Sequence, residues 1–136
     1  MVLVIGATNR PQELDEAARR RFVKRLYIPL PDQVTRTSLL KRLLSKNANS
    51  VTEEELMKLV ELTNGYSGAD VTNLAREASM GPLRDKMRSK TKEETKELRQ
   101  IKFQDFVSGL RSIRASVSQD DLKGYKEWNE KFGSSL

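Results

Sequence analysis

The sequence lacks cysteine and histidine altogether, and it contains no run of 18 or more apolar residues. Without cysteine there can be no disulfide framework and no thiolate metal site. Without histidine the commonest metal ligand and general base is missing, which excludes Ser-His and Cys-His catalysis and makes zinc chemistry untenable. With no long apolar run and no signal-peptide pattern, we expect an intracellular protein of the cytoplasm or nucleus that does not contact membranes.

What the sequence does contain is charge. Of its 136 residues 32% are charged and 37% are hydrophobic, and the net charge is +6. The stretch 84–102 holds eight Lys/Arg and four Asp/Glu, and so supplies +4 of that total. Such a stretch is either a solvated connector or a strip that binds nucleic acid or acidic protein tails, and the sequence leaves both interpretations open.

The first 32 residues predict part of a parallel α/β sheet. Val2–Ile5 is an unbroken aliphatic run, typical of a strand buried on both faces, and Arg25–Leu30 is a second strand candidate. Two strands do not make a stable buried parallel sheet. We therefore expect a remnant of a larger sheet, with the beginning of the fold missing.

The rest of the chain predicts helices. Leucines at helical spacing indicate a helix over Val34–Lys46, and apolar residues from Phe103 to Ile113 indicate another. Gly81-Pro82 should interrupt a helix. Three capping-box patterns predict helix starts, at Thr52/Glu55, Ser67/Asp70 and Ser118/Asp121. The last helix carries an aromatic stripe that favours packing over ligand binding: Tyr125, Trp128 and Phe132.

Chemistry concentrates in Gly6–Asp32. Thr8-Asn9 directly follows the first predicted strand, where open α/β sheets place ligand contacts. Further along, Arg19, Arg20 and Arg21 are adjacent. Arginine matches phosphate oxygens bidentately, but three neighbours on a helix end point in different directions, so at most two could meet one phosphate. Composition alone favours a solvated basic cluster.

Three motifs in this stretch, GATNRP, LDEA and RRF, stand in the order found in the second region of homology of AAA ATPases, which the stretch resembles. The longer form LDEAARRRF-x-KRLYIPLP resembles the meiotic clade of that family (spastin, katanin and the fidgetin group), and its fidgetin-like members most. The resemblance continues through GYSGAD, GPLR and SVSQDDLKGYKEWNEKFG and covers nearly the whole chain.

The resemblance implies a fold and a division of the chain. Residues 1–32 would be two strands of the parallel P-loop sheet, 33–116 the all-α helical lid, and 117–136 a C-terminal helix, so the chain is mostly helical overall. The resemblance also implies roles for five residues. Asn9 matches sensor 1, Arg20 and Arg21 match the arginine fingers that reach the ATP of a neighbouring subunit, and Gly68 and Ala69 match the turn that faces the adenine. No residue matches a sensor-2 arginine, and Arg19 has no assigned role.

The cofactors and partners implied are those of the full-length family: ATP with Mg²⁺, a homo-hexamer, and tubulin, with nucleic acid or recombination proteins as further possibilities. The sequence has no G-x-x-x-x-G-K-[ST] phosphate loop, and the Mg²⁺ ligands belong to segments that it does not contain, so we expect no ATP hydrolysis by this chain alone. Two alternatives stay open. One is a Vps4-like ATPase that disassembles ESCRT, disfavoured because 85–102 is too short for the β domain such relatives insert. The other is a non-enzymatic helical binding module.

Overall fold

The computed structural model describes residues 2–88 and 97–134. The chain divides into two compact units, each described here by itself. The terminal unit consists of Met1–Pro29 with Ser118–Leu136, and the helical unit is Leu30–Val117. Among the described residues, no helix has the length and apolar character needed to cross a membrane.

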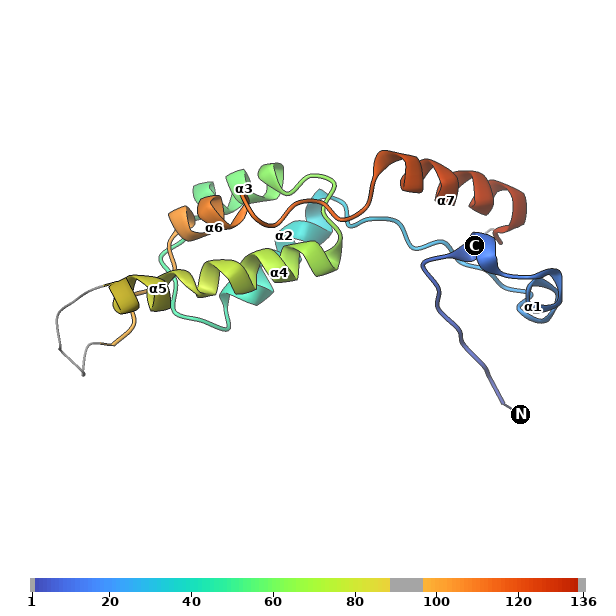
Figure 1. Ribbon diagram of the computed structural model, residues 1–136, viewed down its shortest axis with the longest axis horizontal. Coiled ribbons are helices and arrows are strands. Elements are labelled where there is room, and N and C mark those ends of the chain that lie inside the picture. Colours follow the sequence, from blue (N-terminus) through green and yellow to red (C-terminus); the bar gives the residue numbers. More distant parts are fainter. Residues whose placement is uncertain (1, 89–96, 135–136) are drawn as a thin grey trace. The chain divides into compact units, whose positions relative to one another are not determined.

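Helices account for the regular structure of both units (Figure 1). The helical unit contains α2 (Gln33–Leu44), α3 (Glu53–Leu62), α4 (Gly68–Ser79), α5 (Gly81–Arg88) and α6 (Phe103–Gly109). The terminal unit contains the 3-10 turn η1 (Pro11–Glu13), α1 (Glu16–Arg21) and α7 (Gln119–Phe132). The predicted mostly helical character is confirmed.

The three predicted capping boxes are all present. Ser67 accepts a hydrogen bond from the Asp70 amide at 3.1 Å, and the Asp70 carboxylate accepts one from the Ser67 amide at 2.9 Å. Reciprocal bonds of the same kind start α3 at Thr52 and α7 at Ser118. Each box satisfies amides that the first helical turn would otherwise leave unpaired. The predicted interruption at Gly81-Pro82 is also confirmed, since α4 ends at Ser79 and α5 begins at Gly81.

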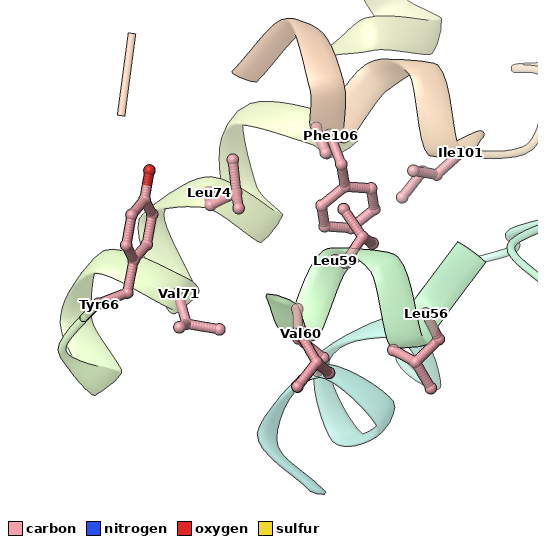
Figure 2. Close-up of a cluster of buried hydrophobic side chains, with 10 residues drawn as sticks. Leu56, Leu59, Val60, Tyr66, Val71, Leu74, Ile101 and Phe106 are labelled. Carbon is pink, nitrogen blue, oxygen red and sulfur yellow. The ribbon is translucent and has the colours of Figure 1, made fainter. Parts of the chain in front are cut away.

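The core lies in the helical unit, where α4 packs against α2 and α6 and α3 packs against α2. The side chain of Phe106 on α6 points toward Leu59 on α3 (Figure 2), and both are almost wholly buried. The residues of this core share near-complete burial: Leu40, Leu56, Leu59, Val60, Tyr66, Val71, Leu74, Ala78, Ile101 and Phe106. Burying such side chains contributes about 1.5–3 kcal/mol each, which makes this cluster the main source of the unit's stability.

The two predicted strands, Val2–Ile5 and Arg25–Leu30, are wrong for the described residues. Neither segment has regular secondary structure, and neither belongs to a β ladder. The side chains of Val2 to Ile5 are 68–88% exposed, and Ile28 is 87% exposed. A strand requires a partner for its amides and carbonyls, and these two segments do not pair with each other. The one β bridge among the described residues is parallel and joins Asn49 to Ile101 in the helical unit.

An ion cluster ties α5 to α6 in the helical unit. The Arg99 guanidinium donates two hydrogen bonds of 2.8 Å to the Asp105 carboxylate and two, of 2.8 Å and 2.5 Å, to the Asp85 carboxylate. The Lys102 amide also donates to Asp105, at 2.8 Å. Gly81 lies directly beneath, because a Cβ built there would stand 2.2 Å from Asp105 Oδ1. The predicted basic stretch 84–102 thus contributes to internal structure through Asp85, Arg99 and Lys102, while its residues 89–96 lie outside the described part.

Acid is expected to weaken the helical unit through this cluster. The Arg99 guanidinium holds the pKa of Asp105 below its ordinary value. The pKa of an aspartate in the unfolded chain is about 3.9, so the stabilisation is complete above about pH 5 and is lost as the pH falls through the lower pKa of the folded state. Thermal unfolding followed by circular dichroism from pH 7 to pH 2 should show this loss, and Asp105→Asn or Arg99→Met should each make the acid dependence shallower. An equally steep fall in both variants would contradict this assignment.

Candidate functional site

The helix that carries the triple arginine is short and capped at its start. Asp15 is the N-cap of α1, and its carboxylate accepts a hydrogen bond of 2.7 Å from the Ala18 amide. Arg19, Arg20 and Arg21 fill the last turn, where cations favour the negative end of the helix. With only six residues, α1 cannot be stable by itself and depends on contacts made around it.

The three arginines have different surroundings. The Arg19 guanidinium donates to the Leu14 carbonyl, lies 5.0 Å from the centre of the Phe132 ring, and is half-buried. Arg20 pairs with Glu16 one turn earlier, yet its side chain is 78% exposed. Arg21 is exposed as well. The structure thus gives Arg19 an internal packing role and presents the other two to the outside.

Asn9 precedes α1 and lies near the beginning of the stretch 6–32 that also contains the three arginines. Its side chain is exposed, and its backbone carbonyl accepts a hydrogen bond of 2.9 Å from the Tyr125 hydroxyl of α7. Thr8 Oγ1 accepts one of 3.0 Å from the Arg10 amide, which shapes the turn just before η1. The aromatic stripe of α7 is therefore in use within the terminal unit, since Tyr125 contacts Asn9 and Phe132 contacts Arg19.

Gly68 and Ala69 form the first turn of α4 in the helical unit. Gly68 is half-buried and Ala69 is exposed. A Cβ on Gly68 would meet nothing within 4 Å, so packing inside the chain does not require glycine there. The turn is small and accessible, which suits close approach by a flat ligand.

The Asp70 carboxylate fixes this turn to the segment that follows α6. Asp70 accepts hydrogen bonds from the Ser116 amide at 3.1 Å and the Ser116 hydroxyl at 3.0 Å, in addition to the capping bond. Burial by itself would raise the pKa of Asp70, but the hydrogen bonds from Ser116 and Ser67 outweigh it, and the pKa is lowered. Asp70 is therefore charged at neutral pH and holds the start of α4 rigidly.

The structure places the predicted site residues in two groups. Asn9, Arg20 and Arg21 belong to the terminal unit, whereas Gly68 and Ala69 belong to the helical unit. Residues 2–88 and 97–134 contain no cluster of three or more side chains suited to hold a metal. Sequence reasoning missed Arg25, which it treated only as the start of a strand. Its guanidinium contacts both α1 and the end of α7, and no local pattern in the sequence signals that role.

Three family models match the chain in succession. Residues 1–30 match the ATPase family associated with various cellular activities (AAA), and 53–97 match the AAA+ lid domain. Residues 84–133 match the Vps4 C terminal oligomerisation domain. The first match contains α1, the second contains α3, α4 and α5, and the third runs from within α5 through α6 and α7. The chain is the C-terminal region of an AAA ATPase.

Individual relatives show which group of AAA ATPases the chain resembles. Spastin of Xenopus tropicalis is 51% identical over 135 residues, which are 98% of this chain and 22% of the relative. The FIGL-1 AAA domain in complex with ADP superposes with a TM-score of 0.89 at 46% identity, over 98% of this chain and 46% of that one. A katanin self-assembly structure superposes with a TM-score of 0.77 at 34% identity, over 88% of this chain and 44% of that one.

Within the AAA ATPases, the chain belongs to the spastin, fidgetin-like and katanin group, as the sequence predicted. It spans about a fifth of the length of the curated spastins that it matches.

Proposed function

We propose that this chain supplies the trans-acting part of an ATP-driven remodelling enzyme. In this proposal Arg20 and Arg21 are arginine fingers that reach the ATP held by a neighbouring subunit, and Asn9 is the sensor that orients the attacking water. The observation that carries the proposal is the difference between the arginines of α1. Arg19 is engaged inside the unit, while Arg20 and Arg21 are exposed at the same helix end. A finger must leave its own subunit to stabilise charge on a transferring phosphoryl group.

The cofactor proposed is ATP with Mg²⁺, and two features of this chain fit the nucleotide. The small, open turn at Gly68 and Ala69 leaves room for the backbone to approach the adenine. The planar guanidinium groups of Arg20 and Arg21 match phosphate oxygens. Residues for Mg²⁺ and for the phosphate loop are not found in this sequence, so we propose that hydrolysis requires the full-length enzyme.

The proposed assembly is a homo-hexamer and the proposed activity is microtubule severing. The match to an oligomerisation domain over 84–133 and the likeness to a structure described as katanin self-assembly support a homo-oligomer. The spastin and fidgetin-like relatives support severing, and a net charge of +6 favours acidic partners such as tubulin tails. Nuclear protein complexes or nucleic acid are the alternative substrates for the same basic chain.

A Vps4-like role in disassembling ESCRT is the second candidate function, since residues 84–133 match the Vps4 C terminal oligomerisation domain. The discriminating feature is the β domain that such relatives insert between lid helices. In this chain α5 ends at Arg88 and α6 begins at Phe103, so the sequence between these helices is only 89–102, which is too short to contain such a domain. A non-enzymatic helical binding module is the third reading, and retained salt-sensitive binding to tubulin tails or DNA after Arg20→Ala and Arg21→Ala would favour it.

The direct test is ATP turnover by the full-length protein that contains this chain. Arg20→Ala and Arg21→Ala, made separately, are expected to abolish most of the turnover while the protein still binds nucleotide. Normal turnover in both variants would contradict the proposal.

The adenine-facing turn has its own expected result. Gly68→Leu should raise the KM for ATP about tenfold or more, corresponding to about 1.4 kcal/mol of lost binding, because the new side chain fills the space proposed for the base. The melting temperature should hardly change, since nothing in the chain lies within 4 Å of a Cβ there. Gly68→Ala is the matched control with the smallest added group. An unaltered KM in Gly68→Leu would remove this turn from the nucleotide site.

A further inference from the structure

We propose that Arg25 is a positioning residue for the arginine fingers, and that it works by fastening the end of α1 to the end of α7. The inference rests on the proposed function of Arg20 and Arg21 and deepens it. In this inference, the correct placement of the fingers depends on the Arg25 side chain, which contacts neither the nucleotide nor the guanidinium group of either finger.

The Arg25 guanidinium binds three backbone carbonyls from two helix ends. Nη1 donates to the carbonyl of Arg19 at 2.6 Å and to that of Phe22 at 2.9 Å. Nε donates to the carbonyl of Phe132, the last residue of α7, at 2.5 Å. These carbonyls belong to the final turns of α1 and α7, where the helix itself provides no donors and where a cation is favoured. The rigid fork of arginine can meet all three acceptors at once.

The backbone beside Arg25 is held by the same partner segment. The Ser134 amide donates to the Arg25 carbonyl at 2.8 Å, and the Arg25 amide donates to the Ser134 hydroxyl at 3.1 Å. The Arg19 guanidinium lies over the Phe132 ring, with its Cζ atom 5.0 Å from the centre of the ring. Phe132 and Ser134 therefore meet Arg19 and Arg25 at several points, so the junction is a fixed contact and not a single bond.

Two of the carbonyls that accept from Arg25, one in the last turn of α1 and one at its C-cap, lie on either side of the fingers in the chain. Arg20 and Arg21 lie between Arg19 and Phe22 in the chain, so clamping the carbonyls on either side fixes the backbone from which both fingers project. A helix of six residues would otherwise fray at this end. Positioning groups must hold within about 0.5 Å of the productive geometry, and a displacement of about 1 Å can cost about a hundredfold in rate.

The experiment is steady-state ATP turnover by the full-length protein carrying Arg25→Lys. Lysine keeps the charge but presents a single point donor that cannot bridge three carbonyls. We expect kcat to fall about a hundredfold, with the KM for ATP unchanged, because the clamp acts on the transition-state contact and not on nucleotide binding. Lys24→Ala, which alters the charge of the exposed neighbour, is the matched control and should retain normal turnover. Normal kcat in Arg25→Lys would overturn the inference.

A double substitution separates positioning from general support. In a background of Arg20→Ala with Arg21→Ala, adding Arg25→Lys should cost no further turnover, because the fingers that it positions are gone. A further loss of the full hundredfold would show that Arg25 acts elsewhere and would overturn the inference. If Arg25→Lys does not fold, Ser134→Ala weakens the same junction more gently and should lower kcat severalfold with KM unchanged; an unchanged kcat there would likewise refute the clamp.

The result also distinguishes this inference from the proposed function beneath it. If Arg20→Ala and Arg21→Ala leave turnover intact, the finger assignment itself fails. If they abolish turnover while Arg25→Lys and Ser134→Ala do not change it, the fingers stand and only the clamp fails.

Discussion

Arg21→Ala is expected to lower ATP turnover of the full-length enzyme about a thousandfold, with nucleotide affinity nearly unchanged. The guanidinium is exposed at the end of α1. In the proposed function it contributes only when charge develops on the phosphoryl group bound by a neighbouring subunit. Arg20→Ala should act in the same direction. Arg42→Ala, an exposed arginine in the last turn of α2, is the control and should keep normal turnover.

Mixed assemblies test whether the fingers act in trans. Subunits with Arg20→Ala and Arg21→Ala retain their own pocket, and subunits with a disabled phosphate loop retain their fingers. Mixing the two inactive forms should restore part of the turnover, because intact fingers then face intact pockets. A mixture as inactive as its components would show that the arginines act within their own subunit, which contradicts the proposal.

The largest expected effect on stability comes from Gly81. Gly81→Val should cost about 3 kcal/mol of the free energy of unfolding of the helical unit, because Asp105 cannot move away from the added group. Gly81→Ala should also destabilise, although alanine is normally the better helix former. Asp105 is held by Arg99 and by the Lys102 amide, and a Cβ at Gly81 would stand 2.2 Å from its Oδ1 and 2.6 Å from its Cγ.

A second helical glycine offers the matched comparison. Gly124 in α7 is exposed, and a Cβ there would meet nothing within 4 Å. Gly124→Ala should therefore leave stability unchanged or raise it by up to about 1 kcal/mol. Urea unfolding followed by circular dichroism measures both variants. Equal effects of alanine at the two positions would contradict the role given to the Asp105 contact.

Local sequence patterns predicted the helices because the signals are local. A capping box needs only a hydroxyl and a carboxylate three residues apart, so Ser67/Asp70 can be read directly from the chain. The same pattern does not show that Asp70 also accepts two hydrogen bonds from Ser116, 46 residues away. Likewise, α1 was visible only as a helix end, since six residues give too little periodicity to assign bounds.

The strands failed for the opposite reason. The aliphatic run Val2–Ile5 has the composition of a buried strand, but a strand exists only through a neighbour. Composition reports what a segment prefers, and the described residues supply no ladder to satisfy that preference here. The candidate site was likewise predicted only in part from the sequence. Family motifs indicated Arg20 and Arg21. The internal contacts of Arg19 and Arg25, in contrast, are made with Phe132, which lies more than a hundred residues away in the sequence.

The terminal unit joins the two ends of the chain, and this has a consequence for the order of folding. Its bonds from Arg25 to Phe132 and Ser134 span 107 and 109 residues, whereas helices of the unit between them are close neighbours in sequence. Contacts of such long range form slowly, because the chain loses the entropy of closing a large loop before these contacts can stabilise it. During synthesis the helical unit can therefore fold while α7 is still unmade, and α1 acquires its anchor only after Phe132 and Ser134 have left the ribosome.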